Sequence, residues 1–217
     1  FAMDFLAQQN RIDSGEKLVN KKISAKGKKV VVIGGGDTGS DCVGTSIRQG
    51  AESVTQIEIM PEPPKERSEH TPWPQWPYQL RTSSSQKEGC ERKWNIKTVN
   101  FAGKGGKIAK INAIQVEWEF DNQGRPVSMK DVPGTEMTIE ADLVLLSMGF
   151  TGIVRKGLAN ALNLKFDDRG NVVVNAKGMT SCKGIFAAGD AASGASLVVR
   201  AIASGRELAD NINEYLS

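Results

Sequence analysis

The sequence predicts an α/β fold in which a parallel sheet carries an inserted antiparallel meander. Three observations support this fold class. An apolar strand at residues 30–33 enters a glycine turn that opens a helix, residues 108–120 alternate as a half-exposed antiparallel strand does, and residues 143–148 form a continuous apolar run. Such a run is typical of a parallel strand that is buried on both faces. A chain of 217 residues is long enough to bury a substantial core.

The glycine turn has the GxGxxG spacing, with the three glycines at Gly34, Gly36 and Gly39. The first permits a tight turn out of the strand, the second lets a ligand approach the backbone, and the third lets the helix pack close to the sheet. The helix then begins near Asp37 and Thr38, where N–H groups without partners and a partial positive charge favour an anion. We therefore expect a Rossmann-like site for the pyrophosphate of a dinucleotide.

The residues that follow agree with this prediction. A helix is expected over residues 37–49, with Gly39, Val43 and Ile47 on its packed face and Gly50 after its end. A second strand at residues 53–58 ends in Glu58, 19 residues after Gly39. An acid at this place accepts hydrogen bonds from the ribose hydroxyls of a dinucleotide. The alternative is a strand, turn and helix with a purely structural role.

Residues 60–94 differ sharply in composition, because they hold six of the eight prolines and three of the four tryptophans. We predict a long functional loop beside the nucleotide site, or else a proline-stiffened surface excursion. Lys65, Arg67 and Arg81 could reach a phosphate from this loop, although charged loop residues are mostly solvated. His70, the only histidine, has no carboxylate partner nearby in sequence and is expected to be solvated.

Three strands are expected after the loop, at residues 97–101, 108–120 and 138–148. The segments between them are rich in turn residues, at 103–106 and 121–125. These strands supply the meander and the buried parallel strand of the predicted fold.

Composition excludes several classes of protein. The net charge of +3 is small and interleaved with acids, which argues against nucleic-acid binding. No apolar stretch approaches the roughly 18 residues of a membrane span, and no signal-peptide pattern opens the chain. The cysteines Cys42, Cys90 and Cys182 are odd in number and form no CxxC, so we expect reduced, packed thiols in a cytoplasmic protein and no metal ligands.

Several motifs together resemble the flavoprotein reductases that have two dinucleotide-binding domains. These motifs are VVIGGGDTGSDC at residues 31–42, ADLVLLSMGF at 141–150 and GIFAAGDAASGASLVVRAIASGRELADNI at 184–212. With TSIRQGA at residues 45–51 and MPEPPKER at 60–67, nearly the whole chain is similar to the small subunit of glutamate synthase.

The resemblance implies a division of the chain into three parts. Residues 1–26 form a lead-in helix and a connection, residues 27–149 a nicotinamide-dinucleotide domain, and residues 150–217 the C-terminal part of an FAD-binding domain. The chain is then expected to be a fragment, without the family's first FAD-binding half and its iron–sulfur region. In that family, electrons from NADH or NADPH pass through FAD and iron–sulfur clusters to a large subunit that makes glutamate.

The resemblance also implies FAD-binding residues in the last part of the chain. Residues 185–190 are expected to form a short buried strand that places Asp190, after Gly189, on the ribityl chain of FAD. Ser196 and Leu197 then start a long helix, which runs to about Tyr215 and faces the flavin. Gly149, in the second motif, completes the predicted cofactor-binding residues.

Alternatives remain at the level of the sequence. The chain could belong to a pyrimidine-degrading dehydrogenase, to a ferredoxin reductase, or to a nucleotide-binding module without chemistry. Glu58 favours NADH because it would repel a 2′-phosphate, whereas Lys65 and Arg67 could accommodate NADPH. No general base is expected, since hydride passes directly between the two cofactors. The fragment alone is expected to be inactive, not to retain FAD, and to self-associate.

Overall fold

The computed structural model describes residues 1–17, 22–75 and 77–217. It divides into two compact units, Phe1–Met148 and Gly149–Ser217. Part of the connection ahead of the first strand, and Trp76 of the proline-rich loop, lie outside the described residues.

The first unit is built on a parallel sheet of four strands in the order β3-β2-β1-β8. The central strand is β1 (Lys29–Ile33), which pairs with β2 (Ser53–Ile57) on one side and with β8 (Leu143–Leu146) on the other. The edge strand β3 (Glu91–Lys93) pairs with β2. The glycine turn and the helix α2 (Asp37–Arg48) connect β1 to β2, as the sequence predicts.

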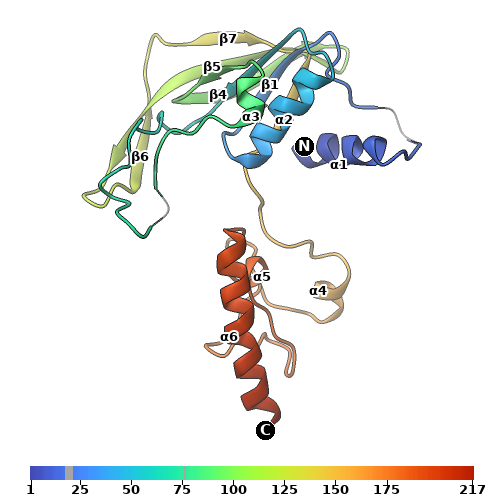
Figure 1. The fold of residues 1–217 in the computed structure, drawn as a ribbon, viewed down its shortest axis with the longest axis vertical. Helices are drawn as coiled ribbons and strands as arrows, with labels where there is room; N and C mark the ends of the chain where they lie inside the picture. The colour runs from blue at the N-terminus through green and yellow to red at the C-terminus, as the bar shows by residue number, and fades with distance from the viewer. Residues whose placement is uncertain (18–21, 76) are drawn as a thin grey trace. The chain divides into compact units, whose positions relative to one another are not determined.

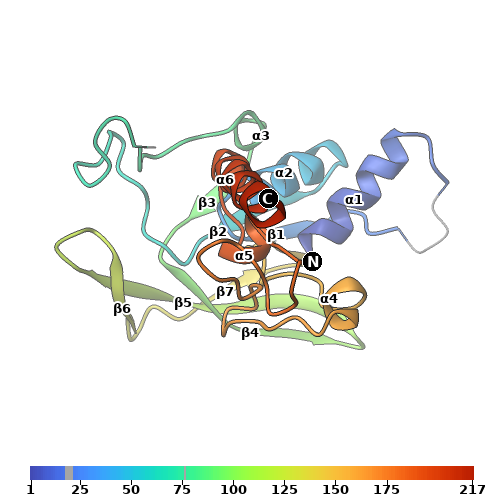
Figure 2. The same ribbon diagram turned by 90° about the horizontal axis from the view of Figure 1, so that it is seen from below.

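The two faces of this sheet are covered differently because successive residues of a strand point to opposite sides. On one face Val30 and Val32 pack with Val43 of α2 and with Phe5 of α1 (Ala2–Asp13). On the other face Val31 packs against the antiparallel meander. Figure 2 shows α1 and α2 on one side of β1 and β2, and β4 and β5 on the other.

The meander contains four strands, listed in chain order as β4 (Ile96–Lys104), β5 (Lys107–Phe120), β6 (Pro126–Asp131) and β7 (Met137–Glu140). The long strand β5 pairs with β4 and β7 through its first half and with β6 through its second half. Its buried positions change parity from Ile111 and Ala113 to Ile114 and Val116. The simple alternation expected for this strand therefore holds only in parts, since each half is covered by different neighbours.

Three expectations for the first unit are corrected. Residues 138–148 are not one strand, because the chain leaves β7 of the meander at Ala141 and enters the parallel sheet as β8. The strand β6 was not expected, since it begins at Pro126, which lacks a backbone donor. The proline-rich segment is not loop throughout, because it ends in a short helix, α3 (Ser84–Lys87), and in β3.

The second unit contains two short helices and one long one. They are α4 (Leu158–Ala161), α5 (Asp190–Ser193) and α6 (Val198–Leu216), joined by segments with isolated β-bridges. Phe186 packs edge-on against Tyr215 of α6, with 5.4 Å between the ring centroids. Val198, Val199 and Ile202 at the start of α6 are exposed.

The short buried strand expected at residues 185–190 is absent. Only Phe186 forms a bridge there, to Met179, and its side chain is half-buried. A strand requires a partner along several residues, and residues 185–190 form a single bridge.

Candidate functional site

The glycine turn lies between the end of β1 and the start of α2, and tertiary packing explains its first glycine. Gly34 has φ +116°, and a Cβ added to it would lie 2.3 Å from the backbone oxygen of Ser147. The Ser147 hydroxyl donates to the carbonyl of Ile33 at 2.8 Å, so the residue that follows β8 is hydrogen-bonded to the residue that precedes the turn. Only glycine fits this position.

Gly39 is required by the turn itself. A Cβ there would lie 2.2 Å from the carbonyl oxygen of Gly34, and the side-chain amide of Gln56 donates to that same oxygen at 2.9 Å. The first turn of α2 therefore packs directly under the backbone of the glycine turn. This is the close helix–strand approach that the sequence predicts for the third glycine of the motif.

Gly36 is different, because no contact with the described residues 1–17, 22–75 and 77–217 requires a glycine there. Its backbone, with φ −73° and ψ −174°, is open to any residue, and a Cβ would meet no atom within 4 Å. Gly36 is exposed and is the N-cap of α2. The space in front of this backbone is open.

The start of α2 supplies the donors of the candidate site. The helix has 12 residues, and its first N–H groups belong to Asp37, Thr38 and Gly39. The first N–H groups of a helix have no intrahelical partner and carry the positive end of the helix dipole. Asp37 is exposed and Thr38 half-buried, so this end of the helix is accessible. The arrangement can hold an anionic group such as a phosphate.

Glu58 lies directly after β2, with its carboxyl group against Gly35. A Cβ on Gly35 would lie 1.7 Å from the Glu58 carboxyl carbon, so a side chain at position 35 would displace the acid. Burial raises the pKa of the Glu58 carboxyl, and the Arg92 guanidinium partly offsets that rise. The structure thus brings the predicted acid and the predicted glycine turn together.

Arg92 of β3 is a residue that sequence reasoning missed. Its Nη2 lies 3.8 Å from Oε1 of Glu58, and its guanidinium lies 4.8 Å from the centre of the Trp94 ring. The strand β3 has only three residues, all charged, and so it has no recognisable strand pattern in the sequence. The position of Arg92 is therefore visible only from the pairing of β3 with β2.

The loop residues Lys65 and Arg67 are exposed. The Arg67 guanidinium donates to the carbonyls of Thr71 and Gln75, at 3.0 and 3.1 Å, so it holds the loop to itself. The Lys65 carbonyl accepts from the Gln79 side chain at 2.9 Å. His70 is exposed and lies over Gly124 at the turn between β5 and β6. None of these observations brings Lys65 or Arg67 to the glycine turn.

The remaining predicted residues lie in the second unit. Gly189 has φ +57° and is buried against Ala201 of α6. Asp190 is exposed at the start of α5, and its Oδ1 accepts from the N–H of Ser196 at 3.3 Å. Leu197 is the N-cap of α6, so the helix begins at Val198, after the residues at which the sequence predicts its start. Gly149, with φ +92°, has no atom within 4 Å of a built Cβ.

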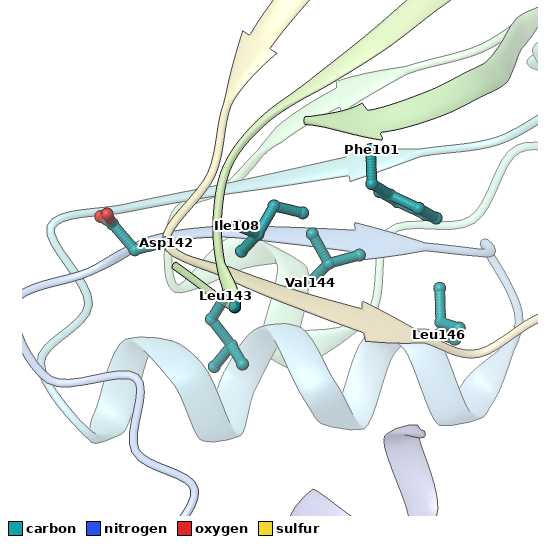
Figure 3. Close-up of a pocket in the computed structure, with 7 residues that line it drawn as sticks. Phe101, Ile108, Asp142, Leu143, Val144 and Leu146 are labelled. Atoms are coloured by element: carbon teal, nitrogen blue, oxygen red, sulfur yellow. The ribbon is translucent and has the colours of Figure 1, made fainter. Parts of the chain in front are cut away.

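A groove of about 360 Å³ lies at the edge of the parallel sheet formed by β8, between β8 and the meander. Figure 3 shows Ile108 and Val144 side by side in it, with Phe101 farther along. The lining is apolar except for Asp142, whose Oδ2 accepts from the backbone N–H of Lys29 at 3.0 Å. The side chains of this lining include no positively charged group for a phosphate, so the groove does not match a dinucleotide site.

Metal and thiol chemistry find no support in the described residues. No group of three or more histidine, cysteine, aspartate or glutamate side chains in residues 1–17, 22–75 and 77–217 could hold a metal ion. All three cysteines are free, and burial raises the pKa of Cys42 to about 12. No helix in the part of the chain that the structure describes is long and apolar enough to cross a membrane.

Comparisons with known proteins agree on the class of fold. The family model "Pyridine nucleotide-disulphide oxidoreductase" matches residues 3–205. Among solved structures, thioredoxin reductase of T. acidophilum is 26% identical with a TM-score of 0.58, over 88% of this chain and 54% of that one. FprA of Mycobacterium tuberculosis in complex with NADPH is 18% identical with a TM-score of 0.59, over 89% and 53%, which shows the fold alone.

Curated relatives are more similar in sequence. The "Glutamate synthase [NADPH] small chain" of Mycobacterium tuberculosis is 46% identical over 99% of this chain and 44% of its own length. The "Glutamate synthase [NADH]" of Schizosaccharomyces pombe is 42% identical over 98% of this chain and 10% of its own. The Bacillus subtilis "Glutamate synthase [NADPH] small chain" is 37% identical over 100% of this chain and 45% of its own. The chain thus spans less than half the length of these relatives.

Proposed function

The chain belongs to the pyridine nucleotide-disulphide oxidoreductase family, and we propose that it is the nicotinamide-nucleotide-binding part of the reductase that feeds electrons into a glutamate synthase. The glutamate synthase relatives named above support the specific assignment, because they match 98–100% of the chain. The fold of the first unit supports the general assignment as a nucleotide-binding part of a reductase.

The observation that carries the proposal is the contrast between Gly36 and its neighbours. Gly34 and Gly39 are each explained by a contact within the protein, whereas a Cβ on Gly36 would project into open space. Gly36 differs from other uncrowded glycines because it is the exposed N-cap of α2, directly after the glycine turn. A glycine at this place lets a ligand approach the backbone closely. The pyrophosphate of a dinucleotide at the start of α2 is such a ligand.

We assign roles at the nucleotide site on this basis. The backbone of Gly34, Gly36 and Gly39 makes room for the pyrophosphate, and the N–H groups of Asp37 and Thr38 face it. The Glu58 carboxylate, held against Gly35, accepts hydrogen bonds from ribose hydroxyls. Lys65 and Arg67 were candidates for a 2′-phosphate, but Arg67 is engaged within its own loop.

The second unit carries the residues proposed for FAD. Asp190 is an exposed carboxylate next to the buried turn at Gly189, and Ser196 and Leu197 lead into a helix of 19 residues. An accessible acceptor beside the start of a long helix fits a ribityl hydroxyl chain and a ring that gains negative charge. Gly149 is included because it belongs to the motif at residues 141–150.

The chemistry requires little from this chain beyond binding. A nicotinamide cofactor supplies a hydride and FAD accepts it when both are bound. The residues named above orient the nucleotide through its phosphates and ribose, and no side chain is required to hold or move a proton. Positioning is the contribution of this chain.

The partners and location are proposed from the relatives. A large subunit would receive the electrons, through iron–sulfur clusters outside this chain, for glutamate synthesis. Three free cysteines support a cytoplasmic location, where thiols stay reduced.

The test is a calorimetric titration of wild-type protein and the Gly36→Ala variant with NADH and with NADPH. The variant should keep the wild-type circular dichroism spectrum and melting temperature, and should lose affinity by about tenfold or more, since the added methyl group occupies the place of the phosphate. The matched control is Gly205→Ala in α6, where a Cβ also meets nothing within 4 Å. Unchanged affinity of Gly36→Ala would remove the main support for the proposal.

A further inference from the structure

The parallel pairing of β3 with β2 places a cation at the proposed ribose site. Arg92 stands opposite Gln56 in the register, and Glu58 follows two residues later, just beyond the end of β2. The N–H of Glu58 donates to the carbonyl of Lys93 at 2.9 Å, so the acid is bound to the strand that carries Arg92. The two side chains therefore lie on adjacent strands at the same end of the sheet.

The Arg92 side chain is held in place by contacts other than Glu58. Its Nη1 donates to the carbonyl of Arg81 at 3.0 Å, and its guanidinium lies over the ring of Trp94. Only 14% of the side chain is exposed. A guanidinium fixed in this way loses little additional freedom when a ligand binds.

The polar groups of Arg92 are not all satisfied. Its Nε is buried without a hydrogen-bond partner among the described residues. Its Nη2 lies 3.8 Å from Glu58 Oε1, which is beyond the roughly 2.7–3.2 Å of a hydrogen bond. The pair therefore attracts electrostatically, while Glu58 does not take up a hydrogen bond from Nη2.

The charge of Arg92 changes what Glu58 can tolerate. An isolated carboxylate at this place would repel a phosphate on the adjacent ribose, which is the reason the sequence favours NADH. A half-buried arginine 3.8 Å away offsets that repulsion, and its planar fork of donors matches the geometry of a phosphate. The exposed Lys65 and Arg67 lie instead on the proline-rich loop.

We propose that Arg92 binds the 2′-phosphate of NADPH, while Glu58 accepts the ribose hydroxyls of NADH, so that the two residues together decide which nicotinamide nucleotide is used. This assignment rests on the proposed function, since it presupposes a dinucleotide on the glycine turn. Arg92 thereby takes the role in nucleotide specificity that the sequence analysis assigned to Lys65 and Arg67.

The experiment measures dissociation constants by calorimetry for NADPH and NADH, and for adenosine 2′,5′-bisphosphate and adenosine 5′-monophosphate. The variants are Arg92→Met, which keeps an apolar stem against Trp94, and Arg92→Lys. The control is Lys93→Met, which removes a positive charge from the next residue of β3, where the side chain pairs with Glu91 at 2.8 Å.

In Arg92→Met the dissociation constants of NADPH and the bisphosphate should rise by about tenfold or more, as expected for a lost charged hydrogen bond. Those of NADH and the monophosphate should change by less than about threefold. Arg92→Lys should retain part of the preference, and Lys93→Met should leave the ratio of the two affinities unchanged. Glu58→Gln should shift the ratio towards NADPH.

Each other result has a definite meaning. Equal losses for both nucleotides in Arg92→Met would show a structural role and overturn the assignment, as would unchanged affinities. If Arg92→Met does not fold, the ratio of the NADPH and NADH affinities in Arg92→Lys and Glu58→Gln tests the assignment: an unchanged ratio in both variants overturns it. If the wild-type protein binds none of the four nucleotides, the proposed function fails first, and the assignment of Arg92 fails with it.

Discussion

The side-chain amide of Gln86 donates a hydrogen bond to Oε1 of Gln56 at 2.8 Å, and Gln56 in turn donates to the carbonyl of Gly34 at 2.9 Å. Both glutamine side chains are buried. Gln86 belongs to α3, near the end of the proline-rich segment, and is also bonded to the N-cap Ser83. A chain of hydrogen bonds therefore connects this segment to the glycine turn. Figure 1 shows α3 beside α2, the helix that follows the turn.

We expect Gln86→Ala to destabilise the protein and to weaken nucleotide binding. The change leaves the buried Gln56 carbonyl oxygen without its donor, which costs about 1–3 kcal/mol. Because Gln56 holds the Gly34 carbonyl, the turn should also lose its fixed geometry. Thermal melting and calorimetry with NADPH measure the two effects.

Gln79→Ala is the control for this change. Its side-chain amide bonds the Lys65 carbonyl in an exposed part of the same segment, so melting and binding should stay close to wild type. Equal behaviour of the two variants would show that the buried chain of hydrogen bonds does not support the turn.

The third glycine of the motif should be a structural residue. In Gly39→Ala the added Cβ would lie 2.2 Å from the Gly34 carbonyl oxygen, which is backbone and cannot rotate away. We expect a loss of about 1–3 kcal/mol in the free energy of unfolding, measured by urea denaturation. Gly36→Ala, whose Cβ meets nothing, should unfold at the wild-type urea concentration. A wild-type midpoint for Gly39→Ala would contradict this packing.

Glu58 should make stability depend on pH. Its pKa is raised, first by burial, with Arg92 acting in the opposite direction. A carboxyl whose pKa is higher in the folded state binds its proton more tightly there, so its favourable contribution is present at low pH. That contribution is lost as pH rises from the ordinary value to the raised one. Between about pH 4 and pH 7, melting temperatures of wild type and Glu58→Gln should therefore converge towards low pH and separate towards neutral pH.

The variant Arg92→Met tests the same pKa shift of Glu58 in the absence of the neighbouring cation. Removal of the cation takes away the part that lowers the pKa of Glu58, so the loss of stability should extend to higher pH than in wild type. A difference between wild type and Glu58→Gln that does not change with pH would show that the carboxyl group titrates normally.

Patterns within a few residues of each other were predicted well. The strand at β1, the helix after Gly36, the strand β2 and the long final helix lie within a few residues of their expected bounds. Each has a local cause that is visible in the sequence, namely apolar runs, glycines and helical spacing. The separation of β7 from β8 within residues 138–148 was missed, because only Ala141 and Asp142 lie between the two strands and neither is a glycine or proline that would mark a turn.

The site divides in the same way. Glycine spacing and the acid at the end of β2 determine by themselves where a dinucleotide could bind, because the backbone around a phosphate is built from consecutive residues. The places of Arg92, Gln56 and Gln86 depend on the pairing of β3 with β2 and on the return of the proline-rich segment to the sheet. Only the tertiary structure decides such contacts, since they join residues about 30 or more positions apart whose types carry no local pattern. The sequence by itself therefore determined the glycine turn and the acid beside it. The packing of the edge strand β3, which the sequence did not predict, decided which charged side chains lie next to them.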